Sequence, residues 1–236
     1  MSAPEVPADV VPTSATRREL AVARALDQRR SRAETRVQLF LDAALELMND
    51  NSGEFTVQEV VERSGQSLRT FYQYFGGKHE LLLALFEESV RAAATHLREV
   101  VDAEGDPISR LHRFNVEYFR MCRLREKGQP PRGPAPAVLE FAQVLLTSHP
   151  REAAHAFAPL VEMLEELLTE AMAAGTIRSD LDGHRVAGTL LQATMFNAVA
   201  DAISGPPLLD GDVGAEALWD LVLRGIGAVA RPGVPK

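Results

Sequence analysis

The sequence predicts an all-α protein, and three observations carry this prediction. Apolar residues recur at helical spacing in nearly every segment, and no stretch alternates between apolar and polar residues as a half-buried strand would. The third observation is a set of capping boxes, in which a hydroxyl and a carboxylate three residues apart satisfy the first N–H groups of a helix. These lie at residues 16–19, 31–34 and 56–59.

Size and composition set the class of protein. A chain of 236 residues can bury a substantial core without disulfides or metal ions. The single cysteine, Cys122, allows no intramolecular disulfide, which favours a reducing compartment. The first 15 residues read as a disordered tail rather than a secretory signal, and no run is apolar and long enough to span a membrane. We therefore expect a cytoplasmic protein without membrane contact.

Charge is distributed unevenly. The net charge of −8 argues against a protein that coats nucleic acid by bulk attraction. Residues 17–36, however, hold seven arginines against three acidic residues, so a local basic surface is expected.

The first hundred residues predict a basic arm and four helices. One helix starts at Thr16 and a second at Ser31, whose buried face is formed by residues 37, 40, 41, 44, 45 and 48. A short helix opens at Thr56 and stops at Ser64-Gly65, and Ser67 caps the next, which ends at Gly76-Gly77. A longer helix begins at Lys78 and runs to about residue 102.

A second, larger helical region follows a break at residues 104–107. Asp106 is the expected N-cap there, with Pro107 at the first helical position. Pro159 is expected to kink its helix or split it in two. The expected helices cover residues 108–125, 137–148, 150–174, 183–204 and 213–230.

Two short helices joined by a glycine-containing turn predict a helix-turn-helix, which places its second helix in the DNA major groove. The run TVQEVVERSGQSLRTFYQYFGGKHELLLAL goes further, since it closely resembles the DNA-binding domain of TetR-family transcriptional regulators. The resemblance covers about residues 33–86 and includes the apolar first helix, the threonine start, the glycine turn, the aromatic third helix and the lysine that opens the fourth. The run AMAAGTIRSDLD is similar to the family's usual approach to its last two helices.

The resemblance implies a TetR-like fold, with an N-terminal three-helix helix-turn-helix domain and a C-terminal bundle for dimerisation and effector binding. The expected organisation is an extension at residues 1–30, disordered and basic, a helix-turn-helix domain at 31–78, a connecting helix at 79–104 and a C-terminal domain at 105–236. It also implies a homodimer that binds a double-stranded DNA operator. No cofactor and no metal ion are expected.

The short helix after Ser67 divides into two faces. A helical wheel places Leu68, Phe71 and Phe75 on the buried face and Tyr72 at its border, while residues 69, 70, 73 and 74 point outward. Gln73 and Arg69 are the candidates for base contacts, because their planar groups pair bidentately with adenine and guanine, although either can reach a phosphate instead. Tyr72 is left open between packing and DNA contact.

The remaining candidates are assigned to the DNA backbone. Thr70 and Lys78 are expected to hold phosphate, and Tyr74 is given the same role with the help of the family resemblance. The arginine arm either enters an adjacent groove or is a solvated extra helix that only raises non-specific affinity. The full predicted DNA-binding set is Arg36, Thr56, Ser67, Arg69, Thr70, Tyr72, Gln73, Tyr74 and Lys78.

The C-terminal helices predict a dimer seam and a small-molecule site. Residues of the dimer seam are expected at positions 186, 190, 191, 194 and 198 and at 218, 221, 222 and 226. Small residues at positions 187, 188, 193 and 200 would let the helices approach closely. The alternative is that these faces pack within one chain. A hydrophobic or amphipathic effector is expected, with Cys122 and His155 as polar points, although methionine and phenylalanine at helical spacing also suit a core. The predicted effector-binding residues are Phe114, Tyr118, Met121, Phe141, Phe157, Met163, Met195 and Phe196.

An enzyme is the class that the sequence argues against. The six histidines form no H-E-x-x-H motif, and neither a nucleophile elbow nor a phosphate-binding glycine loop is present. The sequence therefore predicts a TetR-type transcriptional regulator, and the resemblance implies a repressor that an effector releases from its operator. The alternative is a helical interaction protein that keeps the fold without regulated DNA binding.

Overall fold

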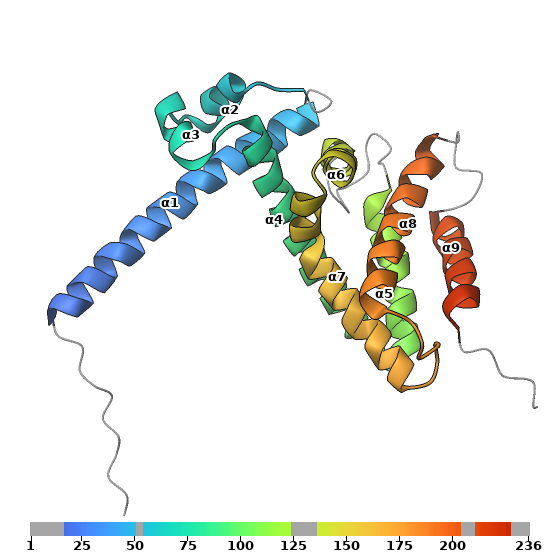
Figure 1. Cartoon of the computed structure of the whole chain (residues 1–236). Helices are drawn as coiled ribbons and strands as arrows, with labels where there is room; N and C mark the ends of the chain where they lie inside the picture. Colours follow the sequence, from blue (N-terminus) through green and yellow to red (C-terminus); the bar gives the residue numbers. More distant parts are fainter. Residues whose placement is uncertain (1–16, 51–53, 124–135, 204–210, 228–236) are drawn as a thin grey trace, which may run out of the picture.

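The computed structural model describes residues 17–50, 54–123, 136–203 and 211–227, and these residues are almost entirely helical (Figure 1). No strand occurs among them apart from an isolated bridge between Ile177 and Gly227. The predicted all-α fold is confirmed. The helices are α1 (Arg17–Asp50), α2 (Val57–Ser64), α3 (Leu68–Tyr74), α4 (Lys78–Val101), α5 (Pro107–Cys122), α6 (Pro136–Ser148), α7 (Pro150–Ala173), α8 (Gly183–Ile203) and α9 (Gly211–Ile226).

Helix α1 is one continuous helix, so the predicted second start at Ser31 is wrong. Residues 20–30 are mostly Ala, Leu, Arg and Gln, which favour helix, and they carry the helix through Ser31. The hydroxyl of Thr35 donates to the Ser31 carbonyl at 2.8 Å within this helix. Residues 17–30 are therefore helical rather than disordered, and the boundary expected after residue 30 falls inside α1. The predicted tail and the cap at Thr16 lie outside the described residues.

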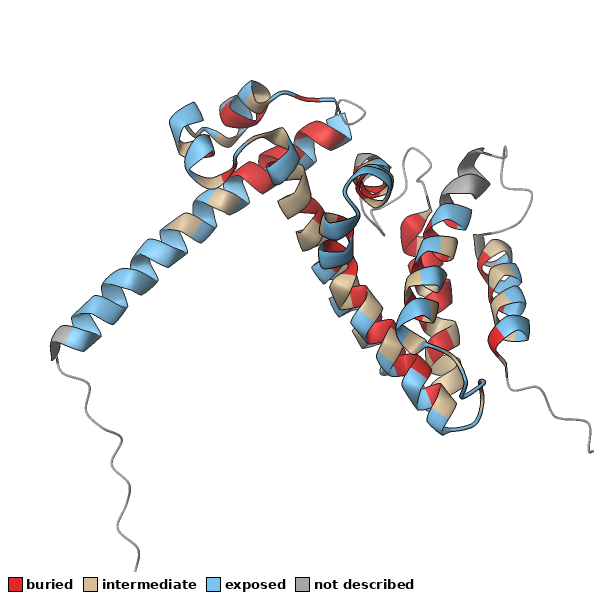
Figure 2. Ribbon diagram, viewed as in Figure 1, coloured by how far each residue is buried: buried red, intermediate tan, exposed pale blue. Residues whose placement is uncertain are grey.

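The two halves of α1 differ in burial. Its first half projects away from the rest of the molecule and is largely exposed, whereas its second half packs against α2 and α4 (Figures 1 and 2). Phe40 and Ala44 are fully buried, as predicted. Leu45, predicted to face inward, is 37 % exposed, and Leu47 is buried in its place. Leu45 lies at the edge of the apolar stripe, where spacing alone does not decide which side chain packs.

Helices α2 and α3 have well-defined ends. At the start of α2, the Thr56 hydroxyl accepts a hydrogen bond from the Glu59 N–H, and the Glu59 carboxylate accepts one from the Thr56 N–H, which completes the predicted capping box. Gly65 ends α2 in the left-handed region at φ 65°. Ser67 then caps α3 by accepting from the Thr70 N–H at 3.1 Å. These caps confirm the predicted helix-turn-helix.

Three phenylalanines hold α3 against α1. The Phe40 ring meets Phe71 edge to face, with centroids 5.4 Å apart, and meets Phe75 in the same way at 6.1 Å. All three side chains are buried. Because α3 is only seven residues long, this aromatic cluster rather than helix propensity decides its orientation.

The C-terminal helices form a bundle in which α5 contacts α4, α7, α8 and α9. Most side chains of α5 are buried or half-buried, consistent with its place between these neighbours (Figure 2). Helix α4 runs from α1 down along α7 and thus belongs to both parts of the molecule (Figure 1).

Helix α7 runs unbroken through Pro159, so the predicted split does not occur. Proline removes one backbone hydrogen bond from a helix. The adjoining residues Phe157 and Leu160 are buried and keep this part of α7 packed in the bundle. Tertiary packing therefore outweighs the local cost of the proline.

Gly65 offers a direct test of the turn between α2 and α3. Its positive φ disfavours any residue with a Cβ, although no atom lies within 4 Å of the position that a Cβ would take. We expect Gly65→Ala to lower the free energy of unfolding by about 1–2 kcal/mol through backbone strain, measured by urea denaturation.

Gly105→Ala is the matched control. The φ of Gly105 lies outside the left-handed region, and no atom lies within 4 Å of the position that a Cβ would take. This change should alter the free energy of unfolding by less than about 0.5 kcal/mol. Equal losses in both variants would contradict the assigned turn.

Candidate functional site

The outward face of α3 is polar and has no partner within the described part of the chain. Arg69, Tyr72 and Gln73 follow i, i+3, i+4 spacing and are exposed. Their polar groups form no hydrogen bond or ion pair with any residue that the structure describes. These three residues, which we call the α3 face, are free to contact another molecule.

The wheel assigned three residues of α3 incorrectly or incompletely. Leu68, predicted to be buried, is 42 % exposed, because it is the first helical residue and its side chain projects past the helix end. Tyr74, predicted to point outward, is partly buried against the core. Tyr72, which the sequence left undecided, is 58 % exposed, and its ring packs edge to face against the Phe71 ring.

The hydroxyl groups expected to meet DNA are engaged in capping. The Ser67 and Thr70 oxygens lie 2.8 Å apart, and the Thr56 hydroxyl donates to Glu59 at 2.9 Å. Hydrogen bonds from the backbone and side chain of Thr56 lower the pKa of the Glu59 carboxyl. The capping contacts fix the position of each hydroxyl at the start of a helix. Each hydroxyl oxygen can still form one further hydrogen bond to another molecule.

Lys78 is held by the protein itself. Its ammonium donates to the Phe55 carbonyl at 2.6 Å and lies 4.2 Å from the centre of the Phe55 ring. The sequence indicated a free lysine at a helix start and could not show this contact, because Phe55 lies 23 positions earlier in the chain. Lys78 thus ties the segment before α2 to the start of α4.

The exposed first half of α1 carries cations without partners among the described residues. Arg24, Arg29, Arg32 and Arg36 are exposed and form no ion pair with any of them. Arg30 is instead paired with Glu34 at 2.8 Å. The described part of the arm is therefore helical and continuous with the rest of α1, rather than a separate extra helix.

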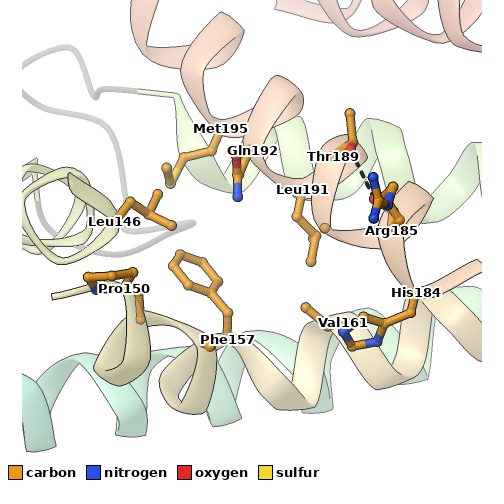
Figure 3. Close-up of a pocket in the computed structure, with 13 residues that line it drawn as sticks. Leu146, Pro150, Phe157, Val161, His184, Arg185, Thr189, Leu191, Gln192 and Met195 are labelled. Atoms are coloured by element: carbon orange, nitrogen blue, oxygen red, sulfur yellow. Dashed lines mark hydrogen bonds between the residues drawn. The ribbon is translucent and has the colours of Figure 1, made fainter.

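A groove opens between the start of α7 and one face of α8 (Figure 3). Its volume is about 370 Å³, within the range of small-molecule pockets. Phe157, Leu146 and Leu191 supply apolar walls, while His184 and Arg185 stand at one end. Such a groove suits an apolar ligand with a polar or anionic end.

The predicted effector residues are only partly brought together. Phe157 and Met195 line the groove and also a smaller cavity of about 30 Å³, which Tyr118, Met121 and Cys122 line too. The other four predicted residues line neither of these cavities, since they are packed in other contacts or, in one case, largely exposed. These are Phe114, Phe141, Met163 and the exposed Phe196.

Sequence reasoning missed the polar part of the groove. Arg185, Thr189 and Gln192 lie on one face of α8 at i, i+4, i+7 spacing and line the groove. A polar stripe on an otherwise apolar helix was the signal that could have found them.

Residues predicted for the dimer seam divide between core and surface. Leu191, Ala198 and Ile226 are buried within the chain, and the buried Thr194 hydroxyl donates to Asn115 at 2.8 Å. Ala187 is buried as well, and the remaining described seam residues are half-buried or exposed, with Leu221 at 68 %. The intramolecular alternative therefore holds for part of the set, and the side chain at position 200 lies outside the described residues.

Comparisons with known proteins agree with this geometry. Residues 40–85 match the family model of the bacterial regulatory proteins, tetR family. A TetR-family transcriptional regulator from Pectobacterium atrosepticum superposes with a TM-score of 0.64 at 19 % identity, covering 86 % of this chain and 99 % of that one. No curated protein matches the chain in sequence.

Two further solved structures share the fold. The regulator FadR from Bacillus subtilis, solved with stearoyl-CoA, has a TM-score of 0.58 at 16 % identity and covers 80 % of this chain and 98 % of its own. A gamma-butyrolactone receptor described as ArpA-like has a TM-score of 0.51 at 23 % identity, with coverages of 85 % and 91 %.

Fold and site together define a helix-turn-helix protein with a separate helical bundle. Residues 40–85 match the tetR-family model, and the chain as a whole has the TetR-like fold. None of the described helices is both long enough and apolar enough to cross a membrane.

The Cys122 thiol should be unreactive in the folded protein. Burial raises its pKa to about 12, against the opposing effect of a hydrogen bond with Tyr118. Because the thiolate is the nucleophile, we expect iodoacetamide at pH 8 to alkylate the folded chain more than about a hundredfold more slowly than the chain in urea. Mass spectrometry measures both rates on the same single cysteine, and equal rates would contradict the buried position.

Proposed function

We propose that this protein is a homodimeric transcriptional regulator that binds a palindromic double-stranded DNA operator and releases it when a small hydrophobic or amphipathic effector binds. The observation that carries the proposal is the α3 face, which presents an arginine, a tyrosine and a glutamine without partners among the described residues. Because α3 is the second helix of a helix-turn-helix, this face is the one that would enter the major groove.

Base reading is assigned to Gln73 and Arg69. A glutamine amide pairs with adenine and an arginine guanidinium with guanine, each through two hydrogen bonds. Tyr72, exposed beside them, supplies a phenol that can contact a phosphate or a base edge.

Backbone contacts are assigned to the surrounding helix starts and to α1. Thr56, Ser67 and Thr70 lie at the first turns of α2 and α3, where N–H groups also favour an anion. The basic helix formed by the first half of α1 extends the positive surface beyond the helix-turn-helix. Tyr74 and Lys78, which are held by internal contacts, contribute chiefly by positioning these elements.

Dimerisation is assigned to α8 and α9. Phe196 is 43 % exposed, Val213 42 % and Leu221 68 %, so these two helices carry apolar surface that a second copy would cover. A two-fold dimer places two α3 helices in successive major grooves, which is the reason for expecting a palindromic operator.

The effector is assigned to the groove between α7 and α8. Its apolar walls and the Arg185 end suit an acyl or ring compound with a polar group, a class to which stearoyl-CoA and a butyrolactone, the compounds named for the two structural neighbours, both belong. Phe157 lines the groove and lies 5.2 Å, centroid to centroid, from Phe86 of α4. A ligand that displaces Phe157 would therefore push on the helix that begins shortly after α3.

The second candidate is a helical interaction protein without regulated DNA binding. The internal engagement of Lys78 favours it, because Arg69 is then the one free cation among the described residues of α3 and the start of α4. Binding of the purified chain to DNA from upstream of its own gene, followed by fluorescence anisotropy, separates the two. Saturable binding that competitor DNA does not abolish supports the regulator, and its absence supports the second candidate.

Gln73→Ala should reduce discrimination at one base pair of each half-site by about 1–3 kcal/mol, because the bidentate contact is lost.

Arg36→Ala should weaken binding to all sequences alike, because it removes a phosphate contact. The slope of log affinity against log salt concentration should fall by about one. Anisotropy titrations against single-base variants of the bound DNA measure both effects. Gln143→Ala on α6 is the control, and identical behaviour of the first two variants would contradict their assigned roles.

Filling the groove should block ligand binding. Gly188 lines the groove with no atom within 4 Å of the position that a Cβ would take, so Gly188→Leu places a side chain in the open space. We expect this change to weaken binding of anilinonaphthalene sulfonate, an apolar probe with an anionic group, by about tenfold. Ala173→Leu, at the exposed end of α7, controls for added apolar surface. Equal probe binding by both variants would place the ligand elsewhere.

A further inference from the structure

Three potential metal ligands meet where the start of α4 touches the corner between α6 and α7. His79 is in the first turn of α4, His149 directly precedes α7, and Glu152 is in the first turn of α7. The ligand atoms of all three lie within 4.8 Å of one another. His79 and Glu152 are 73 positions apart in the sequence, which is why no spacing motif revealed the group.

The carboxylate of Glu152 faces a nitrogen of each imidazole. One oxygen is 2.7 Å from Nε2 of His79, and the other is 3.8 Å from Nδ1 of His149. The two imidazole rings are 4.6 Å apart between centroids. Elsewhere in the described part of the chain, histidines such as His184 and His112 pair with a single carboxylate and have no third ligand.

These positions approach the spacing of a tetrahedral metal site. Metal–ligand bonds of about 2.0–2.2 Å place ligand atoms roughly 3.3 Å apart in a tetrahedral site. The ligand atoms of the three side chains lie within 4.8 Å of one another, so the widest separation would close by at most about 1.5 Å to reach this spacing.

The chemistry of the donor set also suits such an ion. Two imidazole nitrogens and one carboxylate oxygen are ligands that Zn²⁺ and its neighbours among the divalent transition metals prefer. The carboxylate offsets part of the ion's charge and that of the positive ends of α4 and α7. All three side chains are 39–45 % exposed, so an ion and a completing water can reach them.

The His79 ring is already partly held in place. It packs edge-on against Phe141 of α6, with centroids 5.7 Å apart, and Phe141 in turn contacts Phe86. This packing restricts the imidazole and lowers the entropy lost when it binds an ion.

We propose that His79, His149 and Glu152 form a binding site for a divalent transition-metal ion of the Zn²⁺ type, which joins the start of α4 to the start of α7. No ligand of the site belongs to the α3 face or to the groove. The site is therefore separate from both proposed binding functions and lies on the connection between them.

Calorimetric titration of the untagged full-length protein with zinc chloride tests the site. We expect one ion per chain, and we expect His79→Ala, His149→Ala and Glu152→Gln each to weaken binding by more than about tenfold, because even outer-shell changes cost about 10–100-fold. His184→Ala removes an exposed histidine that has a single carboxylate partner and should leave the affinity unchanged.

A second readout reports the ligand geometry. Cobalt(II) should give the visible absorption of a tetrahedral ion in the unchanged protein and lose it in Glu152→Gln, a variant of the same shape whose fold is checked by circular dichroism. Absence of saturable binding, or equal weakening in the His184 and His79 variants, would overturn the site.

The regulatory consequence rests on the proposed function. An ion that joins α4 to α7 restrains the segment that follows α3, so operator affinity should change on zinc addition and should not change in His79→Ala. If zinc binds by calorimetry while operator affinity stays constant, the coupling is wrong and the site stands. If no operator is bound at all, the proposed function fails, and calorimetry still decides the site.

Discussion

The structure depends on helix α4 belonging to two cores at once. One end of α4 packs against α1 in the N-terminal domain, and the remainder lies along α7 in the bundle (Figure 1). Leu81 and Leu97, near its two ends, are both fully buried. Because a packed core tolerates little change in shape, neither end of α4 can move without the other helix contacts responding. The aromatic cluster fixes α3 on α1, and the packing of α4 therefore sets the orientation of α3 relative to the bundle.

This arrangement gives a physical route between a ligand and α3. Phe157 forms a wall of the groove, contacts Phe86 of α4 and lies within the helix that carries Glu152 in its first turn. The start of α4 is held from the other side by Lys78, whose ammonium reaches back to Phe55 ahead of α2. The proposed metal ion would strengthen the same connection. Two ligands of different chemistry would thus act on one helix, and each would bias the same pair of orientations.

Features set by local chemistry could be predicted from the sequence. The caps at Thr56 and Ser67, the glycine that ends α2 and the buried pair Phe71 and Phe75 depend on neighbours within a few residues. Features set by distant partners could not be predicted. Lys78 donates to a carbonyl 23 positions earlier in the chain. Tyr74 packs against the core although the helical wheel placed it on the outward face. The groove forms only because α7 and α8 pack against each other. The predicted helix start at Ser31 was wrong for another reason. The strong helix formers before Ser31 continue the helix through this position despite its capping motif.

The central claim is that the α3 face reads DNA as one half of a two-fold pair. Selection of bound fragments from a random double-stranded library, using the purified folded protein, tests it most directly. The account predicts an enriched two-fold symmetric sequence whose half-site centres lie about 10 base pairs, or a multiple of this, apart. Recovery of no enriched sequence, or of a single asymmetric half-site from a confirmed dimer, would contradict the claim.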